Sequence, residues 1–272
     1  MELNAGQRLA RIQKYICFLP PASVRDFITN RLSLWVFICY NLVGDKCMFD
    51  RLLKLITEED LRKVENKKIL LVGVGGVGGY ALESLVRSGF KSFLIVDGDV
   101  IAISNLNRQI IAKTTNIDKL KVDEAKIRML DINPDINIKT LPIFLTVDNF
   151  KEYINEDFDY IIDACDDISI KIELIKYAKE CNISIITALG TGKKLNPTKL
   201  EITTLSKTFN DPLAKKLRSE LRKRDIDLNI PVVFSSEDAM DTGDVIGSAI
   251  FVPATAGILM ANYIFKDVIK KN

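Results

Sequence analysis

The sequence predicts an α/β protein with a doubly wound, mostly parallel sheet that carries helices on both faces, preceded by a helical amino-terminal extension. From Asn66 onward, short apolar runs alternate with helical stretches. A glycine-rich turn joins the first apolar run to the first helical stretch, and a later run ends in aspartates. This alternation is typical of a parallel sheet that is covered on both faces.

The expected strands are the apolar runs that are short enough for strands and are bounded by polar residues or turn signals. In chain order they are Ile69–Val72, Phe93–Val96, Ile138–Phe144, Tyr160–Asp163, Ile183–Ala188 and Leu200–Thr204. Residues 225–244 are expected to form a loop.

The helical stretches lie between and after these strands. They are Val77–Ser88, Val122–Leu130, Ser169–Glu180, Pro212–Arg224 and Ile246–Ile269. The first has an apolar face at Val77, Ala81, Leu85 and Val86, and the second ends before Asn133-Pro134, because a residue before proline disfavours helical geometry. The last is apolar enough to be a buried helix. Gly257 and the closing lysines argue against a membrane span, but contact of this segment with a membrane stays open.

Residues 1–47 differ from the rest of the chain, because a basic amphipathic start leads through Pro20-Pro21 to the apolar run 32–40. That run is shorter than the ~20 residues that a spanning helix needs. We expect an accessory helical extension over residues 1–47 and one nucleotide-binding domain over residues 48–272.

The composition restricts the chemistry. The chain has 272 residues, 47% of them apolar, and contains no histidine. A Ser-His-Asp triad, a Cys-His pair and an imidazole zinc site are therefore excluded. The five cysteines form no CxxC pair, so we expect no structural zinc, no disulfide framework and a cytoplasmic location. A formal charge of +2 is too close to balance to indicate nucleic acid by itself.

The glycine-rich turn is Gly73-Val74-Gly75-Gly76-Val77-Gly78, between a predicted strand and a predicted helix. Glycines let the backbone approach phosphate groups, and the amino terminus of the helix attracts their charge. Asp97, at the end of the second strand, is placed to accept hydrogen bonds from ribose hydroxyls. These features fit NAD and ATP equally well.

A polar cluster after the second strand favours ATP. Asp99 leads into Ser104-Asn105-Leu106-Asn107-Arg108-Gln109, and Lys121 opens the next helix. An asparagine, an arginine and a lysine near the phosphate turn would neutralise a triphosphate and stabilise the charge of departing pyrophosphate. A nicotinamide site needs no such cluster.

Carboxylates follow the strand Tyr160–Asp163, at the edge of the sheet where ligands of open α/β folds bind. Asp166 is the expected magnesium ligand, because magnesium prefers oxygen ligands and substrate phosphates. Asp167 fits a helix cap better, although it also belongs to the expected nucleotide site. Cys165 and Cys181 are expected to be small core residues.

In order and spacing, these motifs resemble those of the ATP-dependent adenylating enzymes, which include the ubiquitin-activating enzymes and the bacterial molybdopterin and thiamine adenylyltransferases. The resemblance implies a Rossmann-like fold, ATP and Mg²⁺ as cofactors, and a homodimer in which Arg51 reaches the partner subunit's ATP. It implies catalytic roles for Arg51, Arg108, Lys121 and Asp166. The implied nucleotide-binding residues are Gly73, Gly75, Gly76, Gly78, Asp97, Asp99, Asn105, Arg108, Gln109, Lys121, Asp166 and Asp167.

The second half resembles one bacterial branch of this family, the tRNA threonylcarbamoyladenosine dehydratases. The matching segments are Ala188-Leu189-Gly190-Thr191-Gly192, Asn196-Pro197-Thr198, Leu205-Ser206-Lys207-Thr208, Asp211-Pro212-Leu213-Ala214 and Val233-Phe234-Ser235-Ser236-Glu237. This resemblance implies ATP-dependent activation of the threonyl carboxylate of the modified adenosine at position 37 of tRNA, followed by cyclisation with net loss of water. Some relatives have a sulfur-accepting cysteine just before the last segment. Pro231, Val232 and Val233 stand there in this chain, which argues against a sulfur-relay partner.

A tRNA substrate needs a basic surface, because phosphate contacts supply salt-sensitive affinity. Basic residues concentrate between Lys193 and Arg224, and Lys207 and Arg218 are the expected tRNA contacts. The cluster fits a solvated helix face equally well without the resemblance. Two other functions stay open: an adenylyltransferase for a ubiquitin-like sulfur carrier and, more distantly, an NAD(P)-dependent oxidoreductase.

Overall fold

A computed structural model describes residues 48–270, so the expected extension over residues 1–47, and with it the proposed division of the chain, lies outside the described residues. In this part of the chain the centre is a seven-stranded sheet in the order β3-β2-β1-β4-β5-β7-β6. The strands are β1 (Lys68–Val72), β2 (Ser92–Val96), β3 (Asn137–Leu141), β4 (Tyr160–Asp163), β5 (Ser184–Ala188), β6 (Leu200–Thr204) and β7 (Pro231–Ser235).

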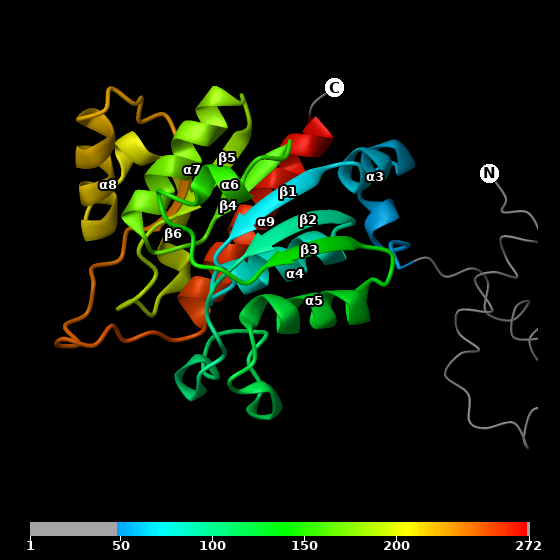
Figure 1. The fold of residues 1–272 in the computed structure, drawn as a ribbon, viewed down its shortest axis with the longest axis horizontal. Coiled ribbons are helices and arrows are strands. Elements are labelled where there is room, and N and C mark those ends of the chain that lie inside the picture. Colours follow the sequence, from blue (N-terminus) through cyan, green and yellow to red (C-terminus); the bar gives the residue numbers. More distant parts are fainter. Residues whose placement is uncertain (1–47, 271–272) are drawn as a thin grey trace, which may run out of the picture. The chain divides into compact units, whose positions relative to one another are not determined.

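The sheet is doubly wound, as expected. Neighbouring strands are parallel except β6 and β7, which pair antiparallel at one edge. The chain builds outward from β1 through β2 to β3 and then returns to add β4 on the other side of β1 (Figure 1). The strand order therefore reverses between β1 and β4, and ligands of open α/β sheets bind at the carboxyl ends of the strands beside such a reversal.

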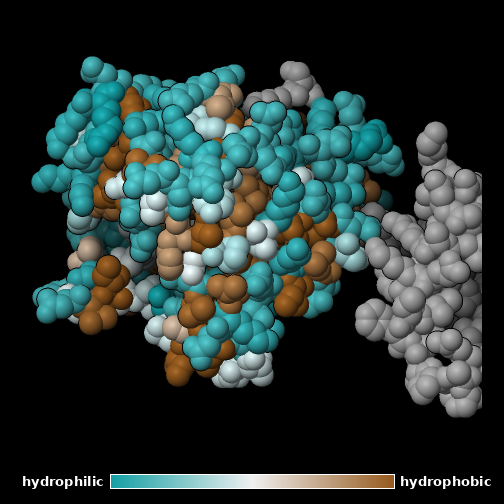
Figure 2. Space-filling view, in the orientation of Figure 1, coloured by the Kyte–Doolittle hydropathy of each residue, from teal (hydrophilic) through white to brown (hydrophobic). Residues whose placement is uncertain are grey.

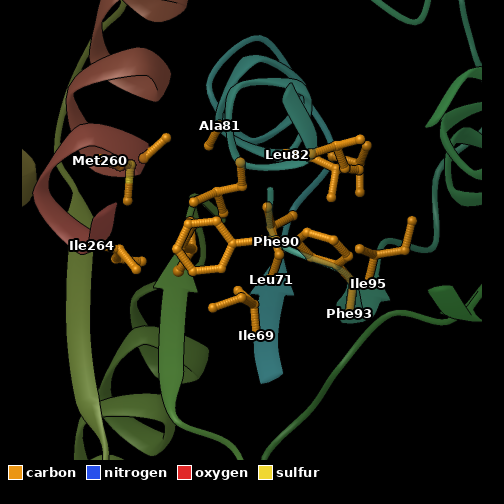
Figure 3. Packing of buried hydrophobic residues seen from close by; sticks show 14 of the residues in the cluster. Ile69, Leu71, Ala81, Leu82, Phe90, Phe93, Ile95, Met260 and Ile264 are labelled. Atoms are coloured by element: carbon orange, nitrogen blue, oxygen red, sulfur yellow. The ribbon is translucent and has the colours of Figure 1, made fainter. Parts of the chain in front are cut away.

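Helices cover both faces of this sheet. They are α3 (Glu58–Glu65), α4 (Gly78–Arg87), α5 (Lys121–Ile132), α6 (Phe150–Tyr153), α7 (Ile168–Glu180), α8 (Pro212–Arg222) and α9 (Phe251–Lys270). One core cluster joins α4, α5 and α9 to one face, and a second joins α6, α7 and α8 to the other. Figure 3 shows the first cluster around Phe90, whose ring lies between the sheet and helices α4 and α9.

The expected strands and helices are confirmed, with corrections to their bounds. The third strand ends at Leu141 instead of Phe144, and the last helix begins at Phe251 instead of Ile246. The expectation of a loop over residues 225–244 is wrong, because β7 lies inside it. β7 contains only the short apolar run Val232–Phe234 after a proline, inside a polar stretch, although four of its five residues are buried.

Helix α9 is buried along one side, as predicted. A Cβ atom at Gly257 would lie 2.2 Å from the carbonyl oxygen of Val77, so α9 packs directly against the start of α4. Pro253 of α9 lies behind Gly76 of the glycine-rich turn. No helix within residues 48–270 combines the length and the apolar character needed to cross a membrane.

Candidate nucleotide site

Three of the four glycines in the turn after β1 differ in what a side chain would meet at their positions. Gly73 has φ +90°, and a Cβ atom there would lie 2.6 Å from the carbonyl oxygen of Ala164. A Cβ atom at Gly78 would lie 1.8 Å from the carbonyl oxygen of Gly73. At Gly75 a Cβ atom would meet only the Gln109 side chain, at 3.8 Å. Folding therefore requires Gly73 and Gly78, whereas Gly75 keeps open a space that a phosphate group can enter.

Asp97 connects the end of β2 to this turn. Its carboxylate accepts hydrogen bonds from the backbone N–H of Val74 at 2.7 Å and from that of Asp99 at 2.9 Å. The ammonium of Lys121, the first residue of α5, lies 2.6 Å from the Asp99 carboxylate and 4.0 Å from that of Asp97. The side chain of Lys121 is only 7% exposed. The structure thus brings Lys121 next to two carboxylates that precede it in the chain, the nearer one by 22 residues.

The loop after β2 carries the predicted Asn105, Arg108 and Gln109. Asn105 is buried, and its side chain accepts a hydrogen bond from the Ala102 N–H at 3.0 Å. Arg108 donates to the Ser104 carbonyl and the Asn107 side chain, so its guanidinium is held by its own loop. Gln109 is buried next to Gly75, and its Oε1 has no hydrogen-bond partner in the described part of the chain. The Gln109 atom that faces the Gly75 space is its Nε2, 3.8 Å from the position of a Cβ atom there, and this N–H₂ group is a donor that a phosphate oxygen can accept from. The unpartnered Oε1 needs a donor such as a hydroxyl, an amino group or water.

The turn between β4 and α7 lies beside the glycine-rich turn, as the contact of Ala164 with Gly73 shows. Asp166 is exposed, and its carboxylate has no partner among residues 48–270. Asp167 accepts from the N–H groups of Ser169 and Ile170, which confirms that it caps α7. Asp166 is therefore the carboxylate of this turn that stays available to a ligand.

A single exposed carboxylate beside a phosphate-binding turn fits magnesium. Magnesium is commonly held by one or two carboxylates together with substrate phosphates and waters. Within the described residues no group of three or more acidic or cysteine side chains could hold a metal by itself. The Asp166 carboxylate fits a magnesium ion whose other ligands come from a nucleotide and water.

The cysteines lie in different environments. Burial, followed by the nearby Asp163 carboxylate, raises the pKa of the Cys165 thiol well above its ordinary value. A thiol with a raised pKa is a poor nucleophile at neutral pH, which agrees with a packing role for Cys165. Cys181 is exposed, so the expectation of a core position is wrong for this residue, which follows the last residue of α7.

Arg51 is exposed and lies just before the short 3-10 helix η2 (Leu52–Lys54). In Figure 1 this segment, next to α3, lies on the side where β1 begins, whereas the glycine-rich turn follows the end of β1. The structure therefore does not bring Arg51 together with the other predicted site residues of the same chain.

Helix α8 is amphipathic, with Ala214, Leu217 and Leu221 buried. Its outer side carries Lys215, Lys216 and Arg222, which are exposed and form no ion pair within residues 48–270. Hydrophilic side chains dominate the region of α8 at the left of Figure 2. Lys207 is exposed. Arg218 is half-buried, and its guanidinium donates to the carbonyl of Thr208 at 2.9 Å, so part of its function is to hold the segment before α8.

Lys194 departs from the expected basic surface. Its side chain is buried and donates to the carbonyl of Ser235 at 3.0 Å. Burial lowers the pKa of Lys194, while Asp211 and Glu237 act in the opposite direction. A buried ammonium cannot contact a phosphate backbone, so Lys194 does not belong to the basic surface.

Two features of the site could not be found from the sequence. Lys171 of α7 forms a buried ion pair with Asp163 at the end of β4. Asn107 donates to the carbonyl of Ser248, which ties the nucleotide loop to the segment before α9. Asp163 ends a predicted buried strand, but nothing in the local sequence indicates that Lys171 pairs with it or that Asn107 reaches Ser248.

A hollow of about 520 Å³ adjoins Asp166, and its lining comes from the starts of α7 and α8, including Lys216. It connects the carboxylate expected to hold magnesium with the basic helix. A substrate that carries a reactive group on a polyanionic chain can place the group near Asp166 and the chain along α8.

Comparisons with known proteins agree with this geometry. Residues 49–272 match the ThiF family. The chain is 36% identical to the tRNA threonylcarbamoyladenosine dehydratase of Bacillus subtilis, over 79% of this chain and 92% of the relative. It is also similar to the crystal structure of the Escherichia coli tRNA N6-threonylcarbamoyladenosine dehydratase in complex with ATP, with a TM-score of 0.78, 33% identity and coverage of 82% and 94% of the two chains.

A third similarity is shorter. An adenylyltransferase and sulfurtransferase of Scheffersomyces stipitis is 36% identical over only 47% of this chain and 29% of its own length. The similarity to the dehydratases therefore extends over parts of the fold that this match does not include. The chain belongs to the ThiF family and, within it, to the branch of the tRNA threonylcarbamoyladenosine dehydratases.

Proposed function

We propose that this protein catalyses the ATP-dependent dehydration of N6-threonylcarbamoyladenosine in tRNA by activating the threonyl carboxylate. The observation that carries the proposal is the hollow that joins the nucleotide edge of the sheet, at Asp166, to the basic helix α8. The similarity to tRNA threonylcarbamoyladenosine dehydratases over most of both chains supports it.

ATP, when bound, supplies the α-phosphorus to which a carboxylate oxygen can bond as pyrophosphate leaves. In this proposal the glycine-rich turn and the start of α4 hold the phosphates through backbone N–H groups. Arg108 and Lys121 neutralise the charge that develops as pyrophosphate departs. Lys121 lies 2.6 Å from Asp99, so a phosphate competes with Asp99 for the same ammonium.

The bond changes balance without a base from the protein. A threonyl carboxylate oxygen bonds to the α-phosphorus, and the bond from that phosphorus to the pyrophosphate oxygen breaks. An internal nucleophile of the modified nucleoside then bonds to the carboxyl carbon, the bond from that carbon to the AMP oxygen breaks, and AMP leaves with the former carboxylate oxygen. The proton of the nucleophile passes to the phosphate of the departing AMP or to water. The nucleoside loses the elements of one water molecule. Proximity within one nucleoside lowers the barrier of the second step.

Magnesium and a dimer belong to the proposal. Asp166 would hold the magnesium ion that arrives with ATP, since its carboxylate has no other partner among the described residues. Arg51 would act on the ATP of a partner subunit. The position of its segment, where β1 begins, supports action between subunits over action within one chain.

The tRNA would lie along α8 and reach Asp166 through the hollow. Lys215 and Lys216 are the strongest candidates for phosphate contacts, and Lys207 is exposed nearby in the sequence. Exchanging Lys215 and Lys216 for glutamate should weaken tRNA binding and flatten its dependence on salt, because fewer counterions are released. ATP affinity should stay unchanged. Filter binding at several salt concentrations measures the first effect, and an unchanged salt slope would remove α8 from the tRNA interface.

The decisive test is a mass-spectrometric nucleoside digest of threonylcarbamoyl-modified tRNA after incubation with the protein, Mg²⁺ and ATP. The proposal expects a modified adenosine lighter by one water, formed only with ATP and absent for Arg108→Ala. An unchanged nucleoside from a folded, ATP-binding protein would contradict it. In that case pyrophosphate release that depends on a ubiquitin-like carrier protein would indicate the carrier adenylyltransferase instead.

A further inference from the structure

An ion pair without solvent exposure lies directly under the turn that carries Asp166. The ammonium of Lys171 donates to both carboxylate oxygens of Asp163, at 3.0 and 3.1 Å, and to the carbonyl of Ala188 at 2.9 Å. Both side chains have 0% exposure. A lysine ammonium has three donors, and these contacts use all three.

Stability alone does not account for this pair. Each buried ion loses several kcal/mol of solvation, and apolar residues of similar volume in place of a buried pair are often neutral or stabilising. The pair lies at the carboxyl ends of β4 and β5, at the edge of the sheet where ligands of this fold class bind. Its position therefore suits a role in the site better than a role in the core.

The contacts of Lys171 determine where the turn lies. Through Asp163 and Ala188 it joins the end of β4, the end of β5 and the first turns of α7. Asp163 also holds the turn directly, because its carboxylate accepts from the backbone N–H of Cys165 at 3.3 Å and from the Cys165 thiol at 3.1 Å. Further supports are the bond from the Ala164 N–H to the Val72 carbonyl, at 2.9 Å, and the helix cap by Asp167. Asp166 itself is exposed and has no partner among the described residues, so the backbone of the turn sets where its side chain starts and no contact of the protein holds the carboxylate beyond that.

We propose that Lys171 is a positioning residue, which acts through Asp163 to hold the Asp166 carboxylate toward the magnesium ion of the bound nucleotide. This role rests on the nucleotide-binding part of the proposed function. It differs from a catalytic role, because Lys171 is fully buried and does not reach a ligand.

The test uses the double variant Lys171→Met/Asp163→Asn, which removes both charges and leaves no buried charge unpaired. Its matched control, Lys176→Met/Glu173→Gln, removes another ion pair of α7, which is 2.6 Å long and partly exposed. ATP affinity is measured by calorimetry, once in EDTA and once with Mg²⁺, and the thermal midpoint of each protein is recorded. No tRNA is present, so failure of the nucleoside assay would leave the result interpretable.

The expected result is an affinity in EDTA within about threefold of wild type, with an affinity in Mg²⁺ reduced by about 10- to 100-fold, as is typical for loss of a residue that orients a metal ligand. The control should bind as wild type does. Adding Asp166→Asn to the double variant should cause no further loss, because both changes remove the same interaction.

Three outcomes would overturn the proposal. One is a double variant that binds ATP in Mg²⁺ as tightly as wild type. Another is equal loss in EDTA and in Mg²⁺ together with a lowered thermal midpoint, which would assign the pair to the fold. The third is a full additional loss on adding Asp166→Asn, which would separate Lys171 from Asp166.

Discussion

Two glycines of the same turn are expected to respond to alanine in opposite ways. A methyl group at Gly75 would meet only the Gln109 side chain at 3.8 Å, an ordinary van der Waals distance. A methyl group at Gly78 would lie 1.8 Å from the carbonyl oxygen of Gly73, where no rotamer can relieve the overlap. The first substitution therefore enters the space reserved for phosphate, and the second enters the protein itself.

The structure gives the expected size of each effect. Gly75→Ala should leave the fold intact and stabilise it by about 0.4 to 1 kcal/mol, because alanine has less conformational freedom in the unfolded chain. For a chain of this size the thermal midpoint should rise by about 1 to 4 °C. Gly78→Ala should lower stability by about 1 to 3 kcal/mol or more, as overpacking does. ATP affinity of Gly75→Ala should fall at least about tenfold, or 1.4 kcal/mol.

The assay pairs thermal unfolding, followed by circular dichroism, with ATP titration calorimetry on the same preparations. Stability and nucleotide affinity are expected to separate: Gly75→Ala loses affinity without loss of stability, and Gly78→Ala loses stability. If Gly75→Ala bound ATP as wild type does, the open space beside Gln109 would not be the phosphate site. If its thermal midpoint fell as far as that of Gly78→Ala, the geometry of the turn would be misread.

Three further outcomes are expected. Phe90→Ala should cost about 3 to 5 kcal/mol in urea unfolding, because the ring is fully buried in the core of Figure 3, and a loss below 1 kcal/mol would contradict that packing. Lys139 and Lys68 lower the pKa of Glu156 to about 2, so its contribution to stability is present above pH 4.5 and fades as the pH falls toward 2. The stability difference between wild type and Glu156→Gln should shrink over that window in urea titrations, and a constant difference would refute the pairing. Cys165, which is partly buried, should resist alkylation at pH 8 in peptide mapping of the native protein, because its pKa is raised, and rapid labelling would contradict the raised pKa.

The alternation of apolar runs and helical stretches in the sequence was sufficient to predict most of the strands and helices. Strands such as Tyr160–Asp163 appear at their predicted bounds, because a strand buried on both faces is a continuous apolar run. β7 was missed, since it starts with a proline and lies in a polar stretch. The sequence predicted a doubly wound, mostly parallel sheet, but the order of the strands and the antiparallel pairing of β6 with β7 depend on contacts that a local pattern does not contain.

The predicted site is partly assembled in the structure. The ammonium of Lys121 lies 4.0 Å from the Asp97 carboxylate and 2.6 Å from that of Asp99. Gly73 of the glycine-rich turn lies against Ala164, which is in the same turn as Asp166. These residues follow strand ends, and the ends of parallel strands meet at one edge. Arg51 does not join them within one chain, because it precedes the first strand instead of following one.

The sequence alone predicted the strand-turn-helix unit, a nucleotide as the ligand, and the family. Glycine, aspartate and basic residues at these spacings after strands are compatible with few kinds of site other than a nucleotide site. The tertiary structure alone decided which charged residues are buried. Lys171 and Lys194 lie inside the protein, whereas Lys215 and Lys216 face the solvent, and a lysine has the same local signature in both settings. Burial of a charge depends on partners far away in the chain, as Asp163 and Ala188 are the partners of Lys171. Such partners meet only when the sheet has formed.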